Sequence, residues 1–238
     1  MIEMDDVTLE DQLYTASEQN RLERVAELLA NDATNVNGGY QMGAVTPLHV
    51  ACALGHAEVV RMILSHPAVD VNQKSSGGST PFLFAAANGN VEAVVAMLED
   101  HRVELNQSNL PGATGLWHAA SSGHMDVVKW ILASGREVNL AGKCMGANVI
   151  EKARIEKKFD VVELLERFVA EPEEVRADVR RELDIQGLAC FLGKKIFLFF
   201  FFHNLGIPIH HRDAAGKDLW SPPAFPFTHG SNDLRDDR

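Results

Sequence analysis

Residues 46–72 read TPLHVACALGHAEVVRMILSHPAVDVN, a stretch with the signals of two short helices joined by a tight turn. Thr46 can cap the first helix through its hydroxyl, and Pro47 suits the first helical position, where no N–H donor is needed. Gly55 can end that helix in the left-handed conformation. A second helix is predicted over 57–64, with apolar residues along one side. Because one such pair cannot bury its apolar face alone, copies are expected beside it.

Copies of this unit follow at a spacing of 34 residues. Thr80 opens TPFLFAAANGNVEAVVAMLEDHRVELN, and Thr114 opens TGLWHAASSGHMDVVKWILASGREVN. The next step reaches Asn148, which opens a degenerate unit whose second helix, around 161–165, keeps its apolar residues. A further unit is predicted from Thr8, with a polar first helix, as expected where a stack faces water.

This pattern resembles the ankyrin repeat family, and three consecutive copies carry the resemblance. In the first of them, the matching residues are Thr46-Pro47-Leu48-His49, Ala51, Gly55-His56, Val59-Val60, Leu64 and Val71-Asn72. In the degenerate outer units, Gln19-Asn20 and Lys158-Phe159 are expected at the place of Gly55-His56.

The resemblance implies an all-α solenoid of stacked helix–turn–helix units with short β-hairpin tips. Five repeats are predicted over roughly residues 8–169, with the first and last degenerate: 8–45, 46–79, 80–113, 114–147 and 148–169. A helix over 172–184 is expected to cap the open end and complete a domain over 8–185. An irregular or disordered tail is predicted over 186–238, which keeps no repeat phase and is rich in Pro, Ser and Asp near its end.

Charge and cysteine content narrow the function classes. The formal net charge is −11, and residues 1–187 hold 28 of the 33 acidic residues but only 16 of the 22 basic ones. An acidic body without a basic stripe argues against nucleic acid and favours a protein partner with a neutral or basic surface. Cys52, Cys144 and Cys190 form neither a metal spacing nor an even disulfide set. A reducing compartment follows, the cytoplasm or alternatively the nucleus, and a monomer is expected.

No catalytic, cofactor or metal site is predicted. His56 and His124 stand in the Gly-His turns, and His49 lies one helical turn after Thr46, so structural roles are expected for all three. Asp70-Val71-Asn72 and the equivalent triplets lack the glycine and closing Glu of a calcium loop. The start, MIEMDDVTLEDQL, has no apolar run and is not expected to be a secretory signal.

The resemblance implies that a partner docks on the hairpin tips and the inner-helix face. Aromatic side chains beside polar tips are typical of binding surfaces. The predicted partner-binding residues are Tyr40, Gln73, Lys74, Leu83, Phe84, Gln107, Asn109, Trp117 and His118. For Leu83 and Trp117, the alternative is that they fill the space left by the histidine of the preceding copy.

Two functions are compatible with the sequence. The first is a non-catalytic protein–protein interaction module, a scaffold or adaptor. The second is a membrane-associated anchoring protein that uses residues 188–209; its apolar run 196–202 has seven residues, far short of the ~20 that cross a bilayer. A third interpretation concerns the tail alone. Gly193-Lys194 can be encoded GGU-AAG, as at an intron start, so the segment from about Lys194 can be translated intron.

Overall fold

The computed structural model describes residues 8–40 and 44–183, so the predictions for the tail, its intron-like segment and the anchoring segment 188–209 lie outside the described residues. Within the described ranges there are eleven helices and no strand. Their bounds are α1 Leu9–Glu18, α2 Leu22–Leu29, α3 Pro47–Leu54, α4 Ala57–Leu64, α5 Pro81–Asn88, α6 Val91–Glu99, α7 Gly115–Ser122, α8 Met125–Ala133, α9 Val149–Ile155, α10 Phe159–Ala170 and α11 Pro172–Glu182.

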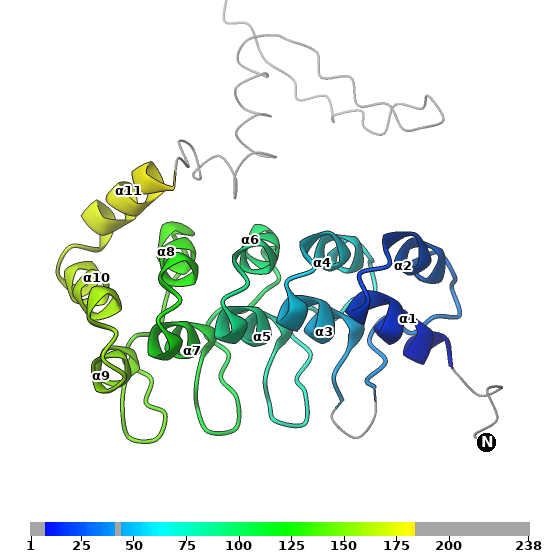
Figure 1. Ribbon diagram of the computed structural model, residues 1–238, viewed down its shortest axis with the longest axis horizontal. Helices are drawn as coiled ribbons and strands as arrows, with labels where there is room; N and C mark the ends of the chain where they lie inside the picture. The colour runs from blue at the N-terminus through cyan, green and yellow to red at the C-terminus, as the bar shows by residue number, and fades with distance from the viewer. Residues whose placement is uncertain (1–7, 41–43, 184–238) are drawn as a thin grey trace, which may run out of the picture. The chain divides into compact units, whose positions relative to one another are not determined.

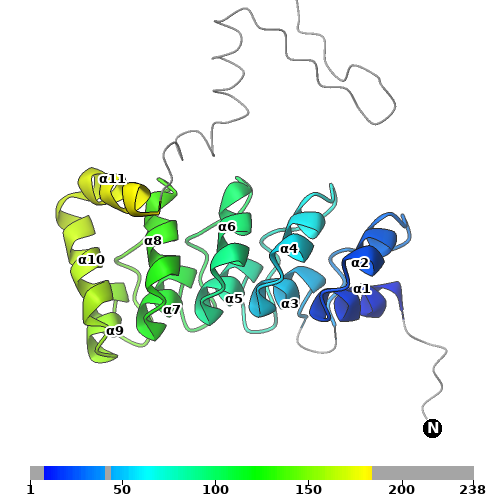
Figure 2. The same ribbon diagram turned by 45° about the horizontal axis from the view of Figure 1, so that its top comes forward.

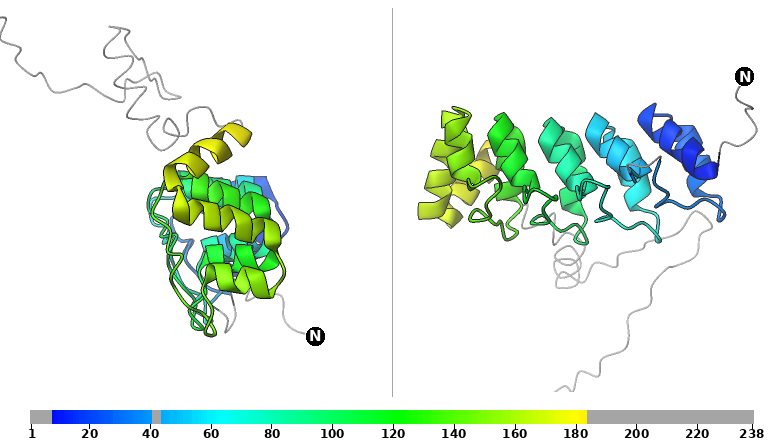
Figure 3. Two further views of the ribbon diagram at one scale, coloured as in Figure 1. Left: turned by 90° about the vertical axis from the view of Figure 1, so that its left-hand side faces the viewer. Right: turned by 90° about the horizontal axis from the view of Figure 1, so that it is seen from below.

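The first ten helices form five pairs stacked in two layers. The inner layer holds α1, α3, α5, α7 and α9 side by side, and the outer layer holds α2, α4, α6, α8 and α10 (Figure 1). The connections between pairs project as hairpins on one side of the inner layer (Figure 3). Each hairpin has at most an isolated bridge, such as Ser108 with Thr114. The predicted all-α repeat solenoid is therefore confirmed.

Every inner helix begins at a residue whose side chain caps it. The cap oxygen accepts from the backbone N–H three residues on, at Thr8, Thr46, Thr80, Thr114 and Asn148. Behind these caps the apolar residues of both layers meet in one continuous core, which includes Leu48, Val60, Phe82 and Val128. Local capping thus fixes where each helix starts, and burial against the neighbouring pair holds it there.

Each inner helix of the described repeats is followed by a residue with left-handed backbone. Gly55, Gly89 and Gly123 hold it in the three regular repeats, with φ between 73° and 82°. In the first and last repeats Asn20 and Lys157 hold it, with φ of 55° and 58°. The sequence-based alignment of Gln19-Asn20 and Lys158-Phe159 with Gly55-His56 is therefore wrong by one residue. The expected equivalence failed because neither position is a glycine, and only the backbone conformation identifies it.

The residue after this turn caps the inner helix of the preceding repeat. His56 Nε2 lies 3.0 Å from the Glu18 carbonyl oxygen, and His124 Nε2 lies 3.0 Å from that of Ala87. In the repeat between them Asn90 does the same, donating to the carbonyls of Cys52 and Ala53. These bonds satisfy carbonyls that a helix end leaves without an intrahelical partner.

Asparagine side chains tie the hairpins together. Asn72 Nδ2 donates to the Arg102 carbonyl at 2.7 Å, and Asn72 Oδ1 accepts from the Glu104 N–H at 2.9 Å. Asn37 makes the same pair of bonds to the second repeat. Asn106 Nδ2 donates to the Glu137 carbonyl, and Asn106 Oδ1 accepts from the Asn139 N–H. Compared with the partners of Asn37 and Asn72, these partners lie two residues closer in sequence to the asparagine of the next hairpin. The Asp-Val-Asn triplet and its relatives therefore shape the hairpins.

Arginines cap the outer helices in a similar way. Arg102 Nη2 donates to the Leu64 carbonyl at 2.7 Å, and Arg180 Nε donates to the Ala133 carbonyl at 2.8 Å. Arg180 belongs to α11, which lies across the ends of α8 and α10 (Figure 2). The helix predicted over 172–184 thus exists and packs on the outer layer. Two apolar side chains of α10, those of Phe159 and Val169, stay 64% and 60% exposed.

The described residues contain no helix long and apolar enough to cross a membrane.

Substituting Gly89 tests the capping between repeats. Alanine at φ +73° costs about 1 kcal/mol by itself. Its Cβ would also lie 2.6 Å from His124 Nδ1, so the imidazole must leave the Ala87 carbonyl, at a further cost of about 1 kcal/mol. We expect Gly89→Ala to lower the free energy of unfolding by about 2 kcal/mol in urea denaturation.

Gly77→Ala is the matched control, because a Cβ there meets nothing closer than Ser75 Oγ at 3.9 Å. It should leave the unfolding midpoint nearly unchanged. Equal effects of the two substitutions would show that His124 does not hold the repeats together.

Candidate partner-binding surface

His49, Leu83 and Trp117 occupy equivalent positions on the inner helices, two residues before the first alanine of each repeat. All three are buried, with exposed fractions of 0%, 4% and 5%. The prediction that Leu83 and Trp117 offer their side chains to a partner is therefore wrong. The alternative interpretation holds, in which they fill the place of the histidine in the preceding repeat.

The imidazole of His49 links its own cap to the next repeat. The Thr46 backbone N–H donates to Nδ1 at 3.1 Å, and Nε2 lies 3.0 Å from the Ser79 carbonyl oxygen. Because a backbone N–H can only donate and a carbonyl can only accept, the neutral ring must carry its hydrogen on Nε2. Burial lowers the pKa of His49 to about 4, although the contacts with Ser79 and Asp70 act in the opposite direction.

Trp117 makes the same kind of hydrogen bond to the next repeat as His49 makes two repeats earlier. Its Nε1 donates to the Ala147 carbonyl at 3.3 Å, and Ala147 directly precedes the cap Asn148, as Ser79 precedes Thr80. Lys152 Nζ lies 5.5 Å from the centroid of the indole ring, within reach of a cation–π contact. An indole therefore replaces the imidazole as the donor between the fourth and fifth repeats.

Phe84 and His118, one residue further along each inner helix, are half-buried and reach the surface. The Phe84 ring meets His49 edge-on, with 5.4 Å between the ring centroids. Asn109 Oδ1 accepts from the Ala113 N–H at 2.8 Å, which leaves Asn109 Nδ2 to donate to His118 Nε2 at 3.3 Å. The neutral His118 ring then carries its hydrogen on Nδ1. Burial lowers the pKa of His118 and favours this neutral form.

The predicted residues on the hairpins differ in how far they are engaged. Gln73 Nε2 donates to the Asn37 carbonyl, and Gln107 Nε2 donates to Glu104 Oε2, so both amides hold the hairpins in place. Lys74 is exposed, and its Nζ lies 3.4 Å from the Ser108 carbonyl oxygen in the next hairpin.

The Tyr40 ring is stacked on that of Tyr14, with 4.4 Å between centroids and 15° between planes. Sequence reasoning missed Tyr14. The signal was present, since Tyr14 stands two residues before Ala16, as His49 stands before Ala51. Tyr40 therefore has a structural contact in addition to any contact with a partner.

Acidic residues are unevenly placed in the stack. Residues 33–57, 71–91, 105–125 and 138–150 contain no Asp or Glu, and these stretches include the hairpins and the inner helices α3, α5 and α7. The acids of these repeats lie on the outer helices and just after them, as with Glu92, Glu104 and Glu137. The net charge of the chain therefore gives no reason to expect a basic partner on the inner face.

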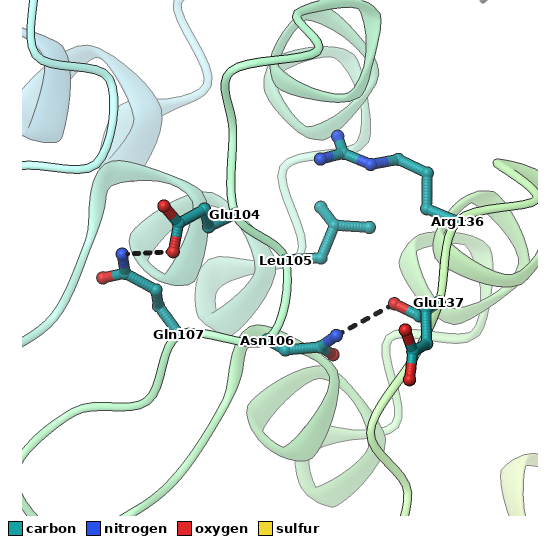
Figure 4. A pocket seen from close by; sticks show the side chains of 6 residues that line it. All are labelled: Glu104, Leu105, Asn106, Gln107, Arg136 and Glu137. Atoms are coloured by element: carbon teal, nitrogen blue, oxygen red, sulfur yellow. Dashed lines mark hydrogen bonds between the residues drawn. The ribbon is translucent and has the colours of Figure 1, made fainter.

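A hollow of about 420 Å³ lies between the third and fourth repeats, where the outer helices lead into the hairpins. Figure 4 shows its lining, which consists of Glu104, Leu105, Asn106, Gln107, Arg136 and Glu137. Polar groups there are engaged with one another: Gln107 with the Glu104 carboxylate, and Asn106 with the Glu137 carbonyl. Arg136 donates to the carbonyls of Asp100 and Val103, so the hollow belongs to the framework between repeats.

Among residues 8–40 and 44–183, no cluster of three or more His, Cys, Asp or Glu side chains could hold a metal ion.

The buried imidazole predicts a pH dependence. An unfolded chain protonates His49 near its usual pKa of about 6.5, whereas the folded chain does so only at about 4. Stability is thus fully present above about pH 6.5 and is lost as the pH falls towards 4. At pH 5 the loss from this residue should be about 2 kcal/mol, measured by urea denaturation against pH 7.

His49→Gln supplies the control, because glutamine does not titrate. The variant should lose less stability than the parent between pH 7 and pH 5, while all other titrating groups, His118 included, contribute equally to both. Parallel pH profiles would contradict the assignment.

Comparison with known proteins agrees with the geometry. A family model described as ankyrin repeats, built of three copies, matches residues 4–75, 66–142 and 82–172. These overlapping matches span residues 4–172, well over half of the 238 residues. A search among curated proteins found no match. The family match agrees with the stacked helix pairs and with the left-handed glycines that end the inner helices of the regular repeats. The chain therefore belongs to the ankyrin repeat family.

Proposed function

We propose that this chain is a non-catalytic scaffold or adaptor that holds a partner protein on its inner-helix face and hairpin tips. Ankyrin repeats are generally protein–protein interaction modules and are typically non-enzymatic.

One contrast between neighbouring positions carries the proposal. At the framework position the side chains are buried and bonded to the next repeat, as with His49 and Trp117. One residue later, Phe84 and His118 are only half-buried, and they present an aromatic face and a ring N–H. Aromatic rings that are rigidly held and still accessible supply large contact area at low entropic cost.

The cysteines support the cytoplasm, or the nucleus, as the proposed location. Cys52 and Cys144 are free and buried, and burial raises the pKa of the Cys52 thiol. The Cys52 thiol therefore stays protonated and unreactive, which fits a reducing compartment. We also propose that the chain acts as a monomer, with the partner as the second component.

Site-specific crosslinking on the full-length chain tests the face. A photo-reactive phenylalanine analogue at position 84 should crosslink a partner protein in extract of the native cells. The same analogue at position 130, a half-buried tryptophan on the outer helix α8, should not. Crosslinking from position 130 but not from 84 would move the binding surface to the outer layer.

With the partner purified, we expect Phe84→Ala to weaken binding tenfold or more, about 1.4 kcal/mol, because the ring supplies contact area at the centre of the face. Trp130→Ala removes an aromatic side chain of similar burial from the other layer. It should lower the melting midpoint and leave the dissociation constant unchanged. Calorimetric titration and thermal melting of both variants separate the two effects, and Tyr40→Ala is a less clean probe because of its stack on Tyr14.

A further inference from the structure

The hydrogen-bond donors of the inner surface point to the chemistry of the partner. His118 Nε2 accepts from Asn109, so the neutral ring carries its hydrogen on Nδ1, which has no acceptor within residues 8–40 and 44–183. The amide orientation of Asn109 is itself fixed, because its Oδ1 accepts from the Ala113 N–H. The half-buried ring therefore offers a donor, not an acceptor, to whatever lies on this surface.

Two lysines from other repeats lie near this donor: Lys74 belongs to the second repeat and Lys152 to the fifth. Lys74 reaches from the preceding hairpin to Ser108, the residue next to Asn109. Lys152 comes from the following repeat and lies over the ring of Trp117, the residue next to His118. Lys74 is thus linked to His118 through Ser108 and Asn109, and Lys152 through the Trp117 ring, whose centroid lies 5.2 Å from that of His118.

The surrounding acids are few and already engaged. Glu156 is paired with Lys152 at 2.5 Å, and Glu151 accepts from the Asn148 N–H within the cap of α9. Glu104 holds Gln107 at the exit of the outer helix, and the inner helices α5 and α7 carry no carboxylate at all. The acids of the outer layer act over distances at which salt screens them, since the Debye length is about 8 Å at physiological ionic strength.

We propose that the inner surface of repeats two to five binds an extended acidic segment of a partner protein. A carboxylate of that segment accepts from His118 and lies between Lys74 and Lys152, while an apolar residue beside it packs on Phe84. Charge complementarity selects this occupant: a carboxylate only accepts hydrogen bonds, and here it meets the His118 donor, the exposed ammonium of Lys74 and the ammonium of Lys152, which it would share with Glu156. A lysine- or arginine-rich segment would bring donors against donors. The inference rests on the inner-face binding proposed above.

Selection from a displayed library of short random peptides, against the full-length chain, tests the chemistry. We expect enriched peptides to be acidic, with an apolar residue near the acids. A fluorescent copy of an enriched peptide should bind at least about tenfold more tightly than its counterpart with Gln and Asn in place of Glu and Asp. The parent chain carrying the photo-reactive analogue at position 84 should crosslink it.

Charge reversal on the protein gives the second arm. Lys74→Glu combined with Lys152→Glu should weaken the acidic peptide about tenfold or more. Arg24→Glu combined with Arg61→Glu changes the net charge by the same amount on the outer layer, where both arginines are exposed, and should change affinity by less than about threefold. His118→Gln supplies an independent variant should the double reversal disturb the stack, and it should also weaken binding.

The outcomes separate the two proposals. Peptides that crosslink from position 84 but are neutral or basic, or that ignore the lysine reversal, overturn the acidic partner and leave the inner-face function standing. Acidic peptides that do not crosslink from position 84, or that respond equally to both double variants, overturn both. A selection that yields no acidic peptides overturns this inference whatever becomes of the inner face.

Discussion

Carbonyl groups at the ends of helices need hydrogen-bond donors, and in this stack the donors come from the following repeat or, for α8, from α11. His56 and His124 serve the inner helices, while Arg102 and Arg180 serve the outer ones. The same contact explains the glycine at each regular turn, because a Cβ on Gly89 would occupy the space of the His124 ring. Helix length, turn position and the phase between repeats therefore depend on one kind of bond between neighbours.

Features that depend on local chemistry could be predicted from the sequence. The threonine caps, the glycine turns and the spacing of 34 residues gave the helices and the stack, because each signal lies within a few residues of its effect. In the sequence-based alignment, the turns of the first and last repeats lie one residue away from Asn20 and Lys157, where the backbone is left-handed. Neither residue is a glycine, so no residue type marks the turn in the sequence. Local sequence signals therefore show roughly where a helix ends, but they do not identify the one residue after it that adopts the left-handed conformation.

The candidate surface was predicted only in part, because its residues are sorted by contacts across repeats. Whether Trp117 faced solvent depended on the Ala147 carbonyl, 30 residues away in sequence. Net charge has a similar limit as a guide to the partner, since it does not say on which layer the acids lie. The printed sequence did hold the missing signal: in the three regular repeats, the stretches without Asp or Glu coincide with the inner helices and most of the hairpins. In these repeats the outer layer and the residues just after it thus carry the acidic charge, which favours solubility.

Because the carbonyls of each helix pair are capped by a later part of the chain, the order of synthesis affects when each pair becomes fully bonded. A chain leaves the ribosome from its N-terminal end, so a helix pair emerges before the donors that close its carbonyls. The inner helix that ends at Ser122 illustrates the delay, because the side chain lying over Gly123 is that of Lys158. Each pair therefore reaches its full set of contacts one repeat late during synthesis, and the growing end of the nascent stack is always its least protected part.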